Sequence, residues 1–200
     1  MLRILFVCTG NTCRSPLAEG LLRIRVHQEG LAAEVRSAGV SAMTGAPISH
    51  NSASLLQEAG FDGSIRSLAI QESEVKWADI ILTMTTGHKR TVIQRFPGAV
   101  EKTFTLKEYV EDDHHILQAI EEREKLVTEV QLKQALSQTV TAEERNRIYS
   151  LEHAIPDYDI SDPFGGSLEV YRQTAKEISG SLDKLVKKLR ERNDGSQTGK

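Results

Sequence analysis

The chain starts with a short apolar run that is followed by a loop and a helical pattern, and this succession limits the possible folds. Residues 2–7 are mostly apolar, and the Cys-Thr-Gly-Asn sequence of residues 8–11 ends the run too early for a helix. Ser15-Pro16 then supplies a capping hydroxyl and a proline for a first helical turn, and leucines follow at helical spacing up to Gly30. The pattern predicts a strand, a loop and a helix in succession.

The same alternation continues along the chain. Three more strands are expected, at residues 34–39, 79–84 and 102–106. Further helices are expected at residues 49–59, 88–95 and 167–192. Strands alternating with helices predict an α/β fold, with an open four-stranded parallel sheet covered by helices on both faces. We expect a single domain over residues 1–192 and a frayed polar tail at residues 193–200.

One segment, at about residues 111–159, departs from this pattern. It lacks glycine, and residues 111–160 hold twelve acidic but only five basic residues. Apolar residues share one helix face at positions 116, 120, 127 and 130, and Thr141 with Glu144 has the capping-box spacing that begins a second helix. These features predict an acidic helical hairpin inserted into the domain. A solvated charged surface explains the charge best, and a partner-binding surface is the alternative.

Composition excludes several classes of protein. With 39% apolar and 26% charged residues, 200 residues suffice for a compact core, so general disorder is excluded. A net charge of −3 provides no basic field for nucleic acid. The first apolar run is too short for a signal peptide or a membrane span, so we expect a cytoplasmic protein without membrane attachment.

The sequence shows no sign of a metal site or a disulfide framework. Cys8 and Cys13 are the only cysteines, too few for such a framework. The adjacent His114 and His115 point to different sides of a helix, so they do not form a ligand pair. We assign His50 and His88 to packing or surface roles. No metal is expected.

Cys8 and Arg14 lie six positions apart across the first loop. Backbone N–H groups of a curled loop, followed by the positive end of a helix, form a cradle for a tetrahedral dianion such as a phosphoryl group. The same donors favour the reactive thiolate form of Cys8, while the Arg14 guanidinium fits two phosphoryl oxygens. Gly10 and Asn11 tolerate the left-handed angles of a tight loop, and the Ser15 hydroxyl is placed to donate to the sulfur. The alternative is a buried, inert cysteine with a surface arginine.

A family resemblance rests on three motifs. Residues 7–16, read with Ser37-Ala38-Gly39 and Asp162-Pro163-Phe164, resemble the low-molecular-weight protein tyrosine phosphatase family. The resemblance spans residue 1 to about 110 and about 160 to 192. It implies a four-stranded parallel sheet, a phosphocysteine intermediate and no metal or other cofactor. The family's functional residues match Cys8, Arg14, Asn11 and Ser15, with Asp162 as general acid.

Asp162 also makes chemical sense by itself. Splitting a phosphoryl bond requires a proton for the leaving group, and a carboxylic acid on a second loop can provide it and later activate water. The alternative interpretation is a simple Asp-Pro turn. The presence of the cysteine loop favours the catalytic interpretation.

Thr12 and Phe164 bear on the substrate. The family's tyrosine phosphatases usually have a bulky aliphatic residue where Thr12 stands, and often a tyrosine where Phe164 stands. Both residues look like those of the branch that acts on phosphoarginine in bacterial proteins. Loss of aliphatic bulk makes room, and the Thr12 hydroxyl can orient water or the phosphoramidate nitrogen; local capping of the loop is its alternative role. Phe164 would form an apolar wall, and Thr9, Gly10 and Cys13 would complete the phosphate-binding loop.

Cys13 invites a redox interpretation. A second thiol near a reactive thiolate can capture its sulfenic acid as a disulfide, although a small apolar side chain under the loop is an equal alternative.

The sequence therefore predicts a protein-arginine phosphatase that hydrolyses phosphoarginine in proteins. The first alternative is a protein tyrosine phosphatase of the same family. An arsenate reductase, which normally needs three cysteines, and a phosphoprotein-binding module without catalysis rank lower.

Overall fold

A computed structural model describes residues 1–197 of the chain. It divides into two compact units, one holding Met1–Val110 and the chain from Tyr158 onward, the other Glu111–Asp157. The strands of the first unit are β1 (Leu2–Cys8), β2 (Ala33–Gly39), β3 (Ile80–Thr83) and β4 (Thr103–Thr105). Its helices are α1 (Arg14–Gln28), α2 (His50–Glu58), α3 (Glu72–Trp77), α4 (Thr86–Arg95), the 3₁₀ helix η1 (Pro97–Lys102), α5 (Leu106–Tyr109) and α8 (Leu168–Gln197).

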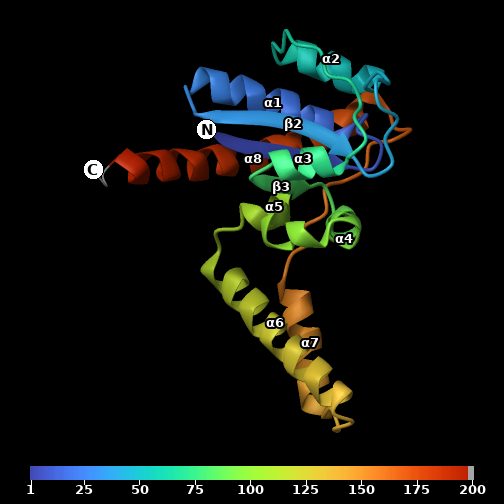
Figure 1. Cartoon of the computed structure of the whole chain (residues 1–200), viewed down its shortest axis with the longest axis vertical. Helices are drawn as coiled ribbons and strands as arrows, with labels where there is room; N and C mark the ends of the chain where they lie inside the picture. Colours follow the sequence, from blue (N-terminus) through green and yellow to red (C-terminus); the bar gives the residue numbers. More distant parts are fainter. Residues whose placement is uncertain (198–200) are drawn as a thin grey trace. The chain divides into compact units, whose positions relative to one another are not determined.

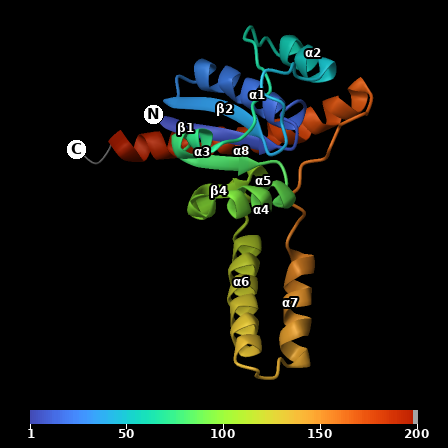
Figure 2. The same ribbon diagram turned by 45° about the vertical axis from the view of Figure 1, so that its right-hand side comes forward.

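The four strands form one parallel sheet in the order β2-β1-β3-β4 (Figures 1 and 2). Leu2 lies opposite Ala33 on one side of β1, and Ile4 lies opposite Ile80 on the other. The chain leaves β1 toward β2 and later returns to β3 on the opposite side. This reversal opens a crevice at the carboxyl ends of β1 and β3, the place where open parallel sheets bind ligands.

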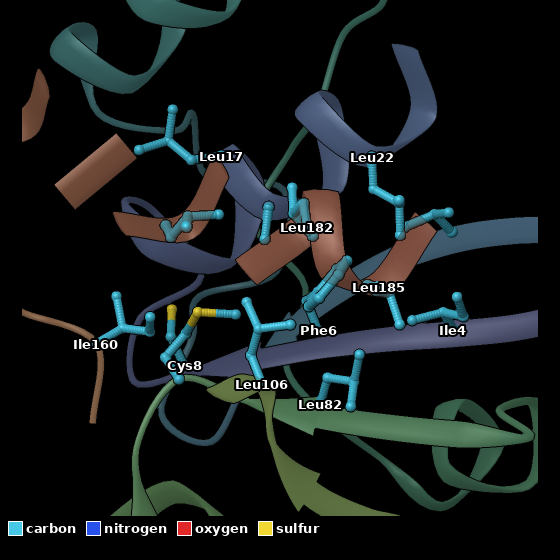
Figure 3. Packing of buried hydrophobic residues seen from close by; sticks show 14 of the residues in the cluster. Ile4, Phe6, Cys8, Leu17, Leu22, Leu82, Leu106, Ile160, Leu182 and Leu185 are labelled. Carbon is cyan, nitrogen blue, oxygen red and sulfur yellow. The ribbon is translucent and has the colours of Figure 1, made fainter. Parts of the chain in front are cut away.

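The core is split between the two faces of the sheet, because successive side chains of a strand point in opposite directions. Ile4 and Phe6 belong to a buried cluster with residues of α1 and α8. Leu5 and Val7 join a second cluster with residues of α3 and α4. Figure 3 shows the first cluster, with Cys8 and Ile160 in it. The predicted α/β fold, a four-stranded parallel sheet with helices on both faces, is confirmed.

Two predicted helix boundaries are wrong. The helix expected to end near Arg192 continues as α8 to Gln197, since no proline interrupts it. The rest of the expected frayed tail, residues 198–200, lies outside the described residues. Helix α1 begins at Arg14 with Cys13 as its N-cap, so Ser15 is not the cap. Its hydroxyl is engaged elsewhere, as described below.

The second unit is a hairpin of α6 (His114–Ala135) and α7 (Ala142–Ala154), which run side by side (Figure 2). The capping box predicted at Thr141 and Glu144 is present at the start of α7. Ion pairs join the two helices, between Lys133 and Glu144 and between Arg147 and Glu122. Within residues 1–197, no helix has both the length and the apolar composition needed to cross a membrane.

Candidate active site

The loop between β1 and α1, residues 8–14, lies at the crevice where the strand order reverses. Gly39 at the end of β2 runs directly beside it. A Cβ atom at Gly39 would lie 2.5 Å from the carbonyl oxygen of Thr9 and 2.8 Å from the backbone nitrogen of Asn11. Glycine is therefore required here so that β2 can approach the loop closely.

Neighbouring segments hold the carbonyl groups of this loop on its outer side. Val40 N donates a hydrogen bond to the carbonyl oxygen of residue 8, and Ser41 N donates to that of residue 9. The carbonyl oxygen of residue 10 accepts from Ser67 Oγ, and that of residue 12 accepts from Ser49 N. All four distances are 2.8–2.9 Å. In a trans peptide the N–H points away from the carbonyl, so the N–H groups of the following residues face the inner side. A concave row of N–H groups next to a helix N-terminus suits a phosphoryl dianion.

Asn11 fixes the curve of the loop. It is fully buried with a left-handed φ of 51°, a conformation that asparagine tolerates better than most residues. Its side chain donates to Ser15 Oγ at 2.9 Å and to Ser37 Oγ at 2.7 Å, and accepts from Leu68 N at 2.7 Å. Ser15 in turn donates to Cys8 Sγ at 3.0 Å. The sulfur of Cys8 is thus hydrogen-bonded to the same network that curves the loop.

A buried carboxyl group lies behind this network. Glu19 is 4% exposed and accepts a hydrogen bond from Ser37 Oγ. Burial raises the pKa of Glu19, although the Ser37 hydroxyl and the nearby Arg23 guanidinium oppose the rise. Asn11 is thus connected through Ser37 to a carboxyl group that α1 holds in the interior.

Arg14 links the loop to the segment before α8. Its side chain is only 6% exposed, and it donates to Asp162 Oδ2 at 2.8 Å and to the carbonyl oxygen of Ile160 at 3.2 Å. Its Nε has no hydrogen-bond partner among the described residues. A buried guanidinium with an unused donor costs free energy until an acceptor arrives. This donor is an independent indication that the site binds an anion.

Eight of the ten site residues predicted from the sequence line one cavity of about 240 Å³. They are Cys8, Thr9, Gly10, Thr12, Cys13, Arg14, Asp162 and Phe164. The other two, Asn11 and Ser15, lie fully buried behind the loop. Asp162 is half-exposed, and Phe164 is 80% exposed and forms an apolar wall of the cavity. The structure thus brings all ten residues together from two segments of the chain, residues 8–15 and 162–164.

Thr12 and Cys13 differ in their surroundings. Thr12 is half-buried, and its hydroxyl lies 3.5 Å from Cys13 Sγ. Cys13 is buried, and its sulfur lies 3.1 Å from the hydroxyl of Tyr171 on α8. Burial and the contact with Cys13 raise the pKa of Tyr171, so its hydroxyl stays protonated. Sequence reasoning gave no reason to bring Tyr171 to this loop.

His88 is a second residue that sequence reasoning missed. It is 8% exposed, and its imidazole lies 2.8 Å from Thr9 Oγ1. A lone histidine carries no local signal for such a contact, which depends on α4 following β3 beside the loop. Within residues 1–197, no group of three or more His, Cys, Asp or Glu residues is arranged to hold a metal ion.

Comparison with known proteins agrees with this geometry. The family model for low molecular weight phosphotyrosine protein phosphatases matches residues 3–122. The chain is 36% identical to a protein-arginine-phosphatase of Geobacillus stearothermophilus, covering 94% of this chain and 95% of the relative. It is 31% identical to the low molecular weight protein-tyrosine-phosphatase PtpB of Staphylococcus epidermidis, over 92% of this chain and 96% of that relative.

A solved structure adds a chemical detail. The fold resembles that of a mutant of the arginine phosphatase YwlE with a phosphorylated active site serine, with a TM-score of 0.70 and 31% identity over 94% of this chain and 96% of that one. In that relative, an active-site side chain therefore carries the phosphoryl group.

Proposed function

Because the chain belongs to the low molecular weight phosphotyrosine protein phosphatase family, we propose that it hydrolyses phosphoarginine in proteins through a phosphocysteine at Cys8. The observation that carries the proposal is the cavity in which the buried Arg14, with its unused Nε donor, meets Cys8 and Asp162. The protein-arginine-phosphatase with 36% identity supports the substrate class.

Two displacement steps account for the reaction. In the first, the Cys8 thiolate attacks phosphorus, an S–P bond forms, and the P–N bond to the guanidino nitrogen breaks. The protonated Asp162 carboxyl gives its proton to that nitrogen as it leaves. In the second, the Asp162 carboxylate takes a proton from water, the water oxygen attacks phosphorus, and the S–P bond breaks to release phosphate and the thiolate.

The Arg14–Asp162 ion pair links binding to this chemistry. The guanidinium donates to one carboxylate oxygen of Asp162 at 2.8 Å and to the carbonyl oxygen of Ile160 at 3.2 Å. A phosphoryl dianion offers the planar guanidinium two oxygens and a larger charge, so Arg14 turns its donors to the phosphoryl group. Asp162 is then released from the guanidinium, takes a proton from solvent and faces the leaving group as the acid of the first step.

Thr12 and Phe164 support phosphoarginine over phosphotyrosine as substrate. Thr12 leaves more room in the cavity than a branched aliphatic side chain, and Phe164 provides an apolar wall beside Asp162. Replacing Thr12 with Ile should lower the ratio of catalytic efficiencies for phosphoarginine over phosphotyrosine peptides about 10- to 100-fold. An unchanged ratio would exclude Thr12 as the selecting residue. A tyrosine phosphatase, as in the PtpB relative, is the alternative.

Cys13 supplies reversible redox protection in this proposal. Peroxide oxidises the Cys8 thiolate to a sulfenic acid, and the Cys13 thiol displaces water from it to form a disulfide. Both cysteines are free thiols, the state that the reducing cytoplasm maintains, which supports a cytoplasmic location. After mild peroxide treatment, thiol reductant should restore much more phosphatase activity in the parent protein than in Cys13→Ala. Equal recovery of activity in the two proteins would exclude this role of Cys13.

The hairpin is a candidate surface for a protein partner. Its acidic helices expose Leu132 and Tyr149, and the turn after α6 exposes Leu136, so apolar side chains are available to contact a partner. All residues of the candidate site lie outside it. A variant with all three residues changed to Ser should hydrolyse a small aryl phosphate as fast as the parent protein but should have a lower catalytic efficiency on protein substrates. If the variant matches the parent protein on both kinds of substrate, the hairpin does not contribute to substrate recognition.

The reaction itself is tested with two substitutions. Cys8→Ser should lower phosphate release more than about 10³-fold, because a hydroxyl is a far weaker nucleophile than a thiolate. Asp162→Asn should slow hydrolysis of a phosphoarginine peptide much more than that of nitrophenyl phosphate, whose leaving group needs no proton. Asp183→Asn, which alters an exposed carboxylate paired with Arg25, is the matched control. Equal losses on both substrates would exclude Asp162 as the acid.

A further inference from the structure

The imidazole of His88 bridges two threonine hydroxyls, one of them in the Cys8 loop. His88 lies in the first turn of α4, where Nε2 is 2.8 Å from Thr9 Oγ1 and Nδ1 is 2.8 Å from Thr85 Oγ1. The ring is 8% exposed. The turn between β3 and α4 is therefore connected directly to the loop that cradles the candidate phosphoryl site.

The direction of these hydrogen bonds follows from the helix cap. Thr85 is the N-cap of α4, and its Oγ1 accepts from the backbone N–H of His88 at 3.1 Å. With that lone pair engaged, the Thr85 hydroxyl has its proton available for Nδ1 of the ring. The ring proton then resides on Nε2 and is donated to Thr9 Oγ1. The opposite tautomer would make Thr85 accept twice and turn its proton away from the ring.

The charge around the ring keeps it neutral. The pKa of His88 is lowered to about 4, mainly by burial and in addition by the Arg14 guanidinium, while Asp159 and Asp162 oppose this shift. Arg14 approaches from α1, and both aspartates come from the segment before α8. At neutral pH the imidazole therefore has one proton to donate.

We propose that His88 is a positioning residue that acts through Thr9: by donating from Nε2 to Thr9 Oγ1, it leaves the Thr9 hydroxyl proton free to donate to an oxygen of the bound phosphoryl group. Thr9 lines the same cavity as Cys8 and Arg14. A hydroxyl whose oxygen is held by a fixed N–H donor presents its proton in a limited set of directions. The inference rests on the proposed phosphatase function, in which the cavity holds a phosphoryl group.

The tautomer is tested without any enzyme assay. Long-range ¹H–¹⁵N correlation spectra of the whole protein at pH 7, with His88→Gln used to assign the signals, distinguish a protonated from an unprotonated ring nitrogen. The proposal requires a neutral His88 with its proton on Nε2. A proton on Nδ1, or on both nitrogens, would overturn it.

The action through Thr9 is tested with inorganic phosphate as the probe. Thr9→Val should weaken phosphate binding about tenfold, the effect of one hydrogen bond to a charged group. His88→Leu should have a similar effect, the double variant should be no weaker than Thr9→Val, and His88→Gln should recover much of the loss because its amide retains an N–H donor. Thr91→Val, which removes an exposed hydroxyl bonded to Gly87 within α4, is the control and should bind normally.

The outcomes separate the possible failures. Additive losses in the double variant would show that His88 acts independently of Thr9, and unchanged phosphate binding by Thr9→Val would also overturn the inference. If His88→Leu fails to fold, Thr9→Val and His88→Gln decide the question. Should the parent protein bind phosphate as described but fail to dephosphorylate any phosphopeptide, the proposed function fails while the positioning by His88 stands.

Discussion

The two units of the molecule differ in what holds them together. In the unit that carries the sheet, the largest fully buried side chains come from both the strands and the helices, Phe6, Leu82 and Leu182 among them. In the hairpin, Leu151 is the only buried residue among residues 111–157, and none of the described residues of α6 is buried. The sheet unit is thus stabilised by an extensive core, whereas the hairpin relies on helix caps, ion pairs and partly buried apolar side chains.

A precise site requires the support that only the sheet unit provides. A loop can hold left-handed Asn11 and buried Arg14 only if surrounding elements fix both, and here the donors that hold the loop come from distant segments, including Ser67 and Leu68. The hairpin offers no comparable support. Exposed helices without such support do not position reacting atoms to within a fraction of an ångström.

The greatest loss of stability is expected from a substitution in the core of the sheet unit. Phe6→Ala should lower the free energy of unfolding by about 3–5 kcal/mol, because a fully buried ring leaves a cavity between β1, α1 and α8. Leu132→Ala on the hairpin, where the side chain is 60% exposed, should change it by less than about 0.5 kcal/mol. Urea unfolding of both variants measures the two values. Similar losses would contradict the contrast between the units.

The next effect is a pH dependence confined to the sheet unit. The pKa of His88 is about 4 in the folded protein against 6.5 for the free side chain, so between these values the unfolded chain binds a proton that the folded protein does not. Stability therefore falls as the pH drops from about 6.5 to 4, by about 3 kcal/mol for this group. His88→Gln removes this contribution, so the stability difference between parent and variant should change with pH over that window. Parallel curves from urea unfolding between pH 7.5 and pH 4 would refute this.

The smallest effect concerns the start of α7. Thr141→Ala removes the capping box with Glu144 and should destabilise the hairpin by about 1 kcal/mol. Hydrogen exchange should report faster opening of α7 amides while exchange in β1 and β3 stays unchanged. The matched variant is Thr105→Ala, which removes the buried capping box of α5 and should affect the sheet unit instead. Faster exchange throughout the sheet in Thr141→Ala would show that the two units unfold as one.

Much of the fold could be predicted because its signals are local. The apolar run of β1, the spacing of α1 and the capping box at Thr141 each lie within a few residues. The short helices α3 and α5 escaped prediction because four to six residues hold too little periodicity. The Cys8 loop and Asp162 were predictable from their motifs. The contacts of His88 and Tyr171 with this loop were not, since they depend on how distant elements pack.

The proposed substrate and mechanism are tested together with matched peptides that carry phosphoarginine or phosphotyrosine in the same sequence. Phosphate release by the parent protein gives the ratio of the two catalytic efficiencies. We expect a ratio of at least about 10 in favour of phosphoarginine, with activity abolished for both substrates in Cys8→Ser. A parent protein that prefers phosphotyrosine would contradict the proposed substrate, and full activity of Cys8→Ser on either peptide would contradict the phosphocysteine mechanism.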